Sequence, residues 1–187
     1  ENGAEFYKPS LTAEKKENKA PLRLQFKSDV RGVQQGKKSP TGTISLKATC
    51  ASKEDFTLSL IARSFPAMLA EIAQPAGPPL SYFTGDYLSA DINAKSESGI
   101  GAVAARIRAP NCALDMTAAI DNGFLYLTKP LQAQCTLQKP LGDFILQKYG
   151  IDFIQALKPI TLEIPPEGTK IPLWSPFVNR ITLPQID

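Results

Sequence analysis

The sequence predicts a mainly β protein of the α+β class, built as a curved antiparallel sheet with two or three short helices capping it. Apolar and polar residues alternate through most of the chain, which is the pattern of strands with one apolar face. Helical periodicity appears only in short stretches after Pro66 and Pro140. Because these helices are too few to alternate with every strand, we expect an antiparallel rather than a doubly wound parallel sheet.

The strands are predicted from the alternation and from turn residues between them. Regular alternation begins at Leu22, and the Gly, Pro and Ser residues of 32–42 indicate a long hairpin loop. The Asp-Asn-Gly sequence at 121–123 is a strong signal for a tight hairpin. The predicted strands cover residues 22–27, 44–50, 56–62, 87–94, 103–107, 112–120, 124–127, 131–137 and 160–164.

Two helices are predicted to begin at prolines. Pro66 suits the first helical position, with Ser64 nearby as a cap. The second helix is expected over residues 140–149, closed by Gly150. A further short helix is expected over residues 152–157, before the proline that precedes the next strand.

The chain divides into three predicted regions. Residues 1–20 are polar and lysine-rich and form a loosely held arm or a connecting strand, residues 21–164 form a β-rich domain, and residues 165–187 form a proline-rich extended tail. Pro66 and Pro140 stand in matching places, each between an alternating strand and a helix, so two strand-helix repeats and a single unit are both open. Because the chain starts without Met, we expect it to be a piece of a longer protein.

Composition argues against several classes of function. The 187 residues include no histidine, which removes the commonest general base, the usual hydrolase triad and most zinc and haem sites. The net charge is +3, with no dense basic block interleaved with aromatic residues, so we expect no nucleic-acid partner. We therefore predict that the protein is not an enzyme and has no catalytic residues, no metal site and no cofactor.

Two local features have plain structural interpretations. Residues 99–104 fit the pattern G-x-G-x-x-A, but strand alternation continues after them, so we interpret them as a glycine-rich turn rather than a dinucleotide site. The three cysteines, Cys50, Cys112 and Cys135, each fall in an alternating strand. We interpret them as small buried hydrophobic residues, and whether two of them pair is left open.

Three stretches of sequence suggest a family. They are GDYLSADINAKSES, GAVAARIRAPNCALDMTAAIDNGFLYLTKPLQAQCTLQKPLGDFILQ and GIDFIQALKPITLEIPPEGTKIPLW. Their succession resembles the AsmA-like and TamB-like bacterial envelope proteins, in which a strand, a strand with a proline and asparagine, a hairpin, another strand, a helix and a proline-flanked strand recur. The resemblance covers residues 40–175 and rests on the order of elements and a few turn residues.

The resemblance implies a repeating β-groove with an apolar inner face. It implies a non-enzymatic segment that binds or guides acyl chains of phospholipids or other lipids in outer-membrane lipid transport or biogenesis. The location would be the periplasm or cell envelope of a Gram-negative-type bacterium, with membrane attachment through segments outside this chain. The lipid-binding residues of the groove face would be Leu114, Met116, Ala118, Ile120, Leu125, Leu127, Leu131, Ala133, Cys135 and Leu137.

An alternative from a different class stays open. The same apolar side chains would fill the closed core of a structural or protein-interaction β-sandwich if they packed against a second sheet. Exposed strand edges also make self-association by strand pairing an expected property. The two hypotheses differ in whether the apolar face is an open groove or a closed core.

Overall fold

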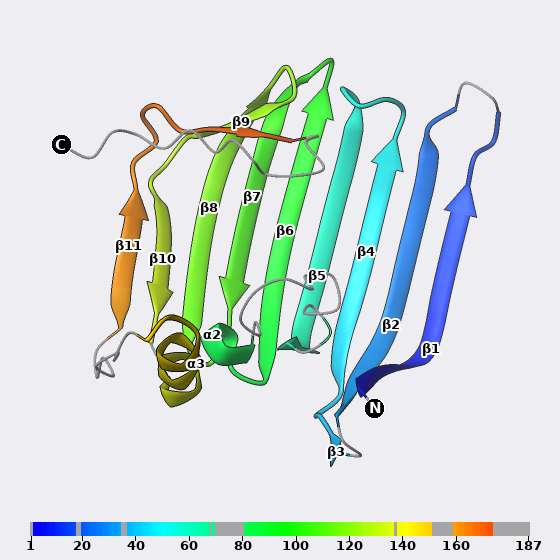
Figure 1. The fold of residues 1–187 in the computed structure, drawn as a ribbon. Coiled ribbons are helices and arrows are strands. Elements are labelled where there is room, and N and C mark those ends of the chain that lie inside the picture. The colour runs from blue at the N-terminus through cyan, green and yellow to red at the C-terminus, as the bar shows by residue number, and fades with distance from the viewer. Residues whose placement is uncertain are drawn as a thin grey trace.

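One antiparallel sheet dominates the computed structural model, which describes residues 2–17, 20–34, 37–67, 69, 81–136, 138–150 and 159–173 (Figure 1). The 12-stranded sheet has the order β1-β2-β4-β5-β6-β7-β8-β10-β11, with β3 attached to β2, and β9 and β12 branching from β8. It is open and curved, and the helices are few and short, which confirms the predicted fold class.

The elements have the following bounds. The strands are β1 (Asn2–Glu14), β2 (Leu22–Gln34), β3 (Lys37–Lys38), β4 (Gly42–Cys50), β5 (Phe56–Pro66), β6 (Tyr87–Glu97), β7 (Ile100–Arg108), β8 (Cys112–Asp121), β9 (Phe124–Leu127), β10 (Leu131–Cys135), β11 (Ile160–Ile164) and β12 (Lys170–Pro172). The helices in the described residues are α2 (Ser81–Thr84) and α3 (Lys139–Tyr149).

Tight turns place consecutive strands side by side. Ser98 and Gly99 join β6 to β7 with φ angles of 52° and 79°, and Asn122 and Gly123 join β8 to β9 with 47° and 82°. Positive φ at both central residues belongs to the type I′ turn, whose twist matches that of the strands it connects. The hairpin predicted at 121–123 is therefore confirmed, and the glycine-rich stretch 99–104 is a turn running into a strand.

Hydrogen bonds also link these turns to one another along the upper edge of the sheet. The amide of Gly99 donates to the carbonyl of Glu54 at 3.1 Å, and the amide of Asn122 donates to the carbonyl of Gly99 at 3.0 Å. The amide of Leu173, after β12, donates to the carbonyl of Gly123 at 2.9 Å. The end of β12 is thereby joined to the hairpin turn beside it.

Two predicted regions differ from the structure. The loop expected over 32–42 is mostly strand, because β2 continues to Gln34, where it still pairs with Asn2 of β1. The region expected as an extended tail contains β12, whose three residues pair with β9. The side chain of Thr169 is buried and donates to the carbonyl of Pro165 at 3.0 Å, which turns the chain back toward β9.

The helices follow the prediction in part. Pro140 lies in the first turn of α3, and Gly150 ends the helix with a φ of 67° and an amide bond to the carbonyl of Leu146, as predicted. Pro66 is instead the last residue of β5, and Ser64 lies at a bulge with a φ of 48°. Residues 67 and 69 are helical, but most of that predicted helix, and the one at 152–157, lie outside the described residues.

Strand register divides the sheet into an apolar face and a polar face. One row that crosses the apolar face from β2 to β9 consists of Leu24, Ala48, Leu58, Ala94, Val103, Ala118 and Leu127. The residues next to these in sequence point to the polar face, because side chains alternate along a strand. The buried core lies on the apolar face and includes Val30, Ala62, Ala90, Val103, Ala118, Ile120 and Leu127.

Short elements cover parts of the apolar face. Helices α2 and α3 lie at the lower end of the sheet (Figure 1). The rings of Tyr82 in α2 and Phe144 in α3 meet edge-on, with their centroids 6.2 Å apart. The β9 and β12 ribbon lies across the upper part of β7 and β8 (Figure 1). In the described part of the chain no second sheet stacks on this face.

Candidate functional site

The sheet register gathers the predicted groove-face residues on the apolar face. Leu114 stands beside Ile107 of β7 and Ala133 of β10, and Cys135 stands beside Cys112. Leu127 and Leu125 of β9 stand opposite Ala118 and Ile120 of β8. Leu131 shares this face because it is two residues from Ala133, and Met116 because it is two residues from Leu114. Leu137 lies outside the described residues.

Burial separates this set into two groups. Ala118, Ile120 and Leu127 are only 1%, 2% and 6% exposed, and they lie where β8 pairs with β9. Leu114, Met116, Leu125, Leu131, Ala133 and Cys135 are half-buried. Only the half-buried group is open to contact with a ligand, whereas the three buried side chains hold the ribbon to the sheet.

The predicted groove residues belong to the segment from β8 to β10, but the apolar face extends further across the sheet. Leu11, Phe26, Leu46, Leu60 and Ile92 continue one row across β1 to β6. The sequence signal for this extension is the alternation of apolar and polar residues in 22–27, 44–50 and 56–62, because strands that pair in register share an apolar face.

The margins of the apolar face are the most exposed. Leu11 on β1 is 67% exposed, and Leu162 on β11 is 55% exposed. Phe6, Leu22 and Ile160 are also among the exposed large apolar side chains. Phe6 reaches Phe26 of β2 with ring centroids 6.5 Å apart, which confirms that both rings share one face. Large apolar side chains left in water on one surface are typical of a binding surface.

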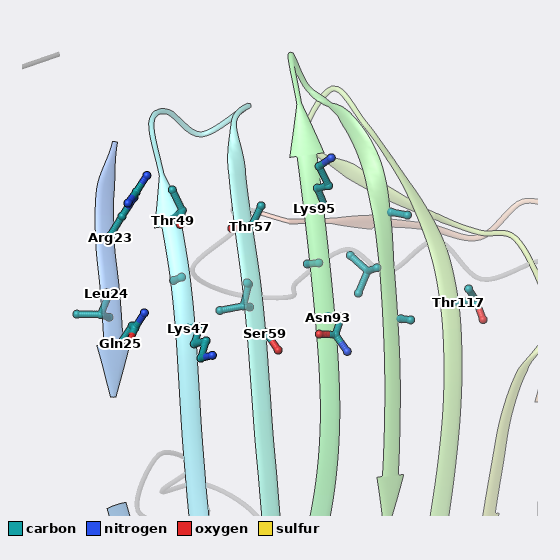
Figure 2. Close-up of a pocket in the computed structure, with 16 residues that line it drawn as sticks. Arg23, Leu24, Gln25, Lys47, Thr49, Thr57, Ser59, Asn93, Lys95 and Thr117 are labelled. Carbon is teal, nitrogen blue, oxygen red and sulfur yellow. The ribbon is translucent and has the colours of Figure 1, made fainter. Parts of the chain in front are cut away.

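The polar face contains an open depression of about 590 Å³ that crosses β2 to β8 (Figure 2). Most of its lining residues are cationic, hydroxyl, amide or small residues of the polar face, namely Arg23, Gln25, Lys47, Thr49, Thr57, Ser59, Asn93, Lys95, Ala102, Ala104 and Thr117. Leu24, Ala48, Leu58, Ala94 and Val103, which lie between them in sequence, complete the lining. A second depression of about 400 Å³ adjoins it over β6 to β10 and includes Arg106, Asp115 and Gln132. Neither depression has a signal in the sequence, because each collects a few residues from many strands.

The charges beside these depressions are largely arranged in ion pairs. Asp115 accepts from Arg108 at 2.6 Å and from Arg106 at 3.2 Å. The hydrogen bond from Arg108, followed by that from Arg106, lowers the pKa of Asp115 despite some desolvation. Such a carboxylate stays ionised and paired near neutral pH, so it is poorly suited to accept or donate a proton in catalysis.

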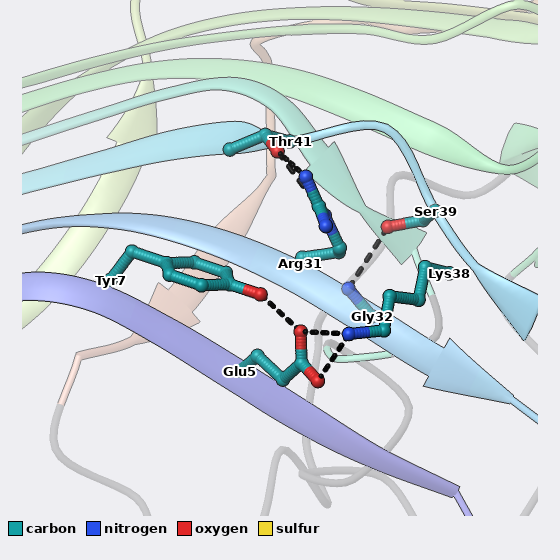
Figure 3. Close-up of polar contacts among 7 residues, drawn as sticks. All are labelled: Glu5, Tyr7, Arg31, Gly32, Lys38, Ser39 and Thr41. Atoms are coloured by element: carbon teal, nitrogen blue, oxygen red, sulfur yellow. Dashed lines mark hydrogen bonds and ion pairs between the residues drawn. The ribbon is translucent and has the colours of Figure 1, made fainter. Parts of the chain in front are cut away.

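A polar network ties β1 to the β2 and β3 hairpin on the polar face (Figure 3). Tyr7 donates to the carboxylate of Glu5, and Lys38 donates to the same carboxylate at 2.9 Å. Arg31 lies over the Tyr7 ring, 5.5 Å from its centroid, and donates to Thr41 at 2.8 Å. The hydrogen bond from Tyr7, and then that from Lys38, lowers the pKa of Glu5.

The described residues contain no group of three or more histidine, cysteine, aspartate or glutamate side chains that could hold a metal ion. None of the helices in the same part of the chain has the length and apolarity needed to cross a membrane. The comparisons with known proteins found no matching family model, no matching curated protein and no matching solved structure.

Proposed function

We propose that this chain is a non-enzymatic segment of a larger envelope protein, which binds or guides lipid acyl chains along its apolar face in outer-membrane lipid transport or biogenesis. Acyl chains require only an apolar surface of suitable shape, without the precisely placed polar groups that a polar ligand needs. The main support is one apolar face that continues from β1 to β11 and keeps many side chains half-buried or exposed.

The contacts are assigned to accessible side chains. Leu114, Met116, Leu125, Leu131, Ala133 and Cys135 are half-buried on this face. Apolar side chains on neighbouring strands lie about 5 Å apart, so a chain laid across the sheet meets a new side chain at each strand. From the resemblance to AsmA-like and TamB-like proteins, we propose a periplasmic location, with the membrane reached through segments outside this chain.

A pair of neighbouring substitutions tests the proposal. Met116 and Thr117 are adjacent and similarly half-buried, and both border the second depression. Strand alternation nevertheless sends the Met116 side chain to the apolar face and the Thr117 side chain to the polar face. We expect Met116→Glu to reduce retained or liposome-extracted lipid by about tenfold or more, because a carboxylate in contact with acyl chains is costly. Thr117→Glu is the matched control and should leave lipid binding within about twofold of the unmodified protein.

Circular dichroism and sedimentation must show that both variants remain folded and keep the same oligomeric state. Equal lipid binding by folded Met116→Glu and Thr117→Glu would contradict the assignment to the apolar face. Equal loss in both variants would also contradict it, because the effect would then not depend on the face.

A second candidate is a structural or protein-interaction module that associates through strand edges. It is favoured by the length of β1, a strand of 13 residues that pairs only with β2 in the described part of the chain. An unpaired edge presents a row of backbone donors and acceptors that a strand from another molecule can satisfy. Light scattering that shows a mass rising with concentration, in a preparation without lipid, would favour this candidate over lipid binding.

A further inference from the structure

Cys112 and Cys135 stand directly opposite each other on adjacent antiparallel strands. The register pairs Cys135 of β10 with Cys112 of β8. One position further on, the amide of Thr136 donates to the carbonyl of Asn111 at 2.7 Å. Pairs with and without backbone hydrogen bonds alternate along an antiparallel ladder, so the two cysteines occupy a non-hydrogen-bonded pair.

This position suits a cross-strand disulfide. The Cα atoms of a non-hydrogen-bonded pair are about 4.5 Å apart, which is within the range of about 4.4–6.8 Å that a disulfide spans. Both side chains point to the apolar face, because register partners in a sheet share a face. The two thiols are free in the structure and half-buried.

The third cysteine is placed elsewhere. Cys50 pairs with Leu22 of β2 and Phe56 of β5, and strands β5, β6 and β7 separate β4 from β8. The thiol of Cys50 is also exposed, so it provides an internal control for reactivity that depends only on access to solvent. Within one molecule, only Cys112 and Cys135 are positioned to pair.

We propose that Cys112 and Cys135 form a disulfide when the folded protein meets a small-molecule disulfide oxidant such as oxidised glutathione. The thiolate of one cysteine attacks the oxidant's S–S bond, forms a mixed disulfide and releases one glutathione thiolate. The thiolate of the other cysteine attacks the protein sulfur of that mixed disulfide and releases the second glutathione. The protein loses two electrons and two protons, which the two glutathione molecules receive.

The bond would join the sheet at a weakly paired junction. β8 pairs with two strands on the same side: Ala118–Asp121 pair with β9, and Cys112–Asp115 pair with β10. The β10 and β11 ribbon therefore meets the rest of the main sheet through one short ladder, which ends where α3 follows. A covalent link at its last register pair would hold this ribbon, and the apolar residues on it, against β8.

Burial raises the pKa of both thiols, and the nearby Cys135 adds to the rise at Cys112. Because the thiolate is the reacting form, oxidation should accelerate as the pH rises through the alkaline range. If oxidation depended only on exposure to solvent, Cys50 would react before Cys112 and Cys135.

The test incubates the full chain with oxidised glutathione and then blocks free thiols with a maleimide. Peptide mapping without reductant should find a Cys112–Cys135 link with Cys50 still modified by maleimide. The melting temperature of the oxidised protein should be roughly 10 °C above that of the same protein after reduction. This shift follows from the entropy of closing the loop between Cys112 and Cys135, divided by the unfolding entropy of a chain of this length. Cys50→Ser should show the same link and shift, whereas Cys112→Ser and Cys135→Ser should show neither.

Several results would overturn the inference. The inference fails if the link involves Cys50, if links form between molecules, or if maleimide labels Cys112 and Cys135 completely after oxidation. A link without any rise in melting temperature would contradict the proposed clamping of β10. The link and the shift in melting temperature are both measured in the protein without substitutions, so a variant that fails to fold does not affect the conclusion.

Discussion

The burial of Ile120 beneath the β9 and β12 ribbon leads to a quantitative prediction. Ile120 is 2% exposed, whereas Ile100, at the start of the neighbouring strand, is 68% exposed. Replacing Ile120 with Ala removes three buried carbon groups, worth about 2.4 kcal/mol of transfer free energy at about 0.8 kcal/mol each. The cavity left behind adds to this, so we expect a loss of about 3–4 kcal/mol in the free energy of unfolding.

Ile100→Ala is the matched control, because it makes the same chemical change in a strand of the same sheet. Its side chain already contacts water, so the loss should be under about 0.5 kcal/mol beyond the small preference of strands for Ile. Urea denaturation followed by far-ultraviolet circular dichroism measures both losses, provided that the slopes of the two transitions agree. A loss at Ile120 below about 1 kcal/mol, or equal to that at Ile100, would refute the claim that the ribbon covers this part of the apolar face.

Two further predictions concern the backbone and the pH dependence. A Cβ added at Gly101 would lie 1.9 Å from the carbonyl oxygen of Lys95, so Gly101→Ala should destabilise the protein by about 3 kcal/mol in the same urea assay, and an unchanged midpoint would contradict this close approach. The pKa of Glu5 is lowered below its ordinary value of 4.5, first by the hydrogen bond from Tyr7 and then by Lys38. Its contribution to stability is therefore present above pH 4.5 and lost as the pH falls through the lowered pKa. Glu5→Gln should flatten the acid side of the stability curve measured by thermal melts from pH 2 to 6, and an unchanged curve would show that the Glu5 network adds nothing to stability.

Much of the sheet was predictable because its information is local. The alternation of residues 112–120 places Leu114 and Met116 on one face whatever the strand pairs with, since side chains alternate with a period of two. The Asn122-Gly123 turn is specified by the residues that tolerate positive φ. These signals do not depend on the rest of the fold.

The remaining features depend on contacts between distant parts of the chain. The pairing of β12 with β9 brings back a proline-rich region that has no strand signal of its own. The four residues of α2 are too few to show helical periodicity. The depression on the polar face joins Arg23 to Thr117 through strands that meet only in the folded sheet, so no sequence window contains it.

Native mass spectrometry of the full chain, purified without detergent, tests the central proposal most directly. Lipid binding along the apolar face predicts a population heavier than the polypeptide by the mass of an acyl lipid, released by organic extraction and lost in Met116→Glu but not in Thr117→Glu. A single species at the polypeptide mass, which also fails to take up lipid from liposomes, would contradict the proposal.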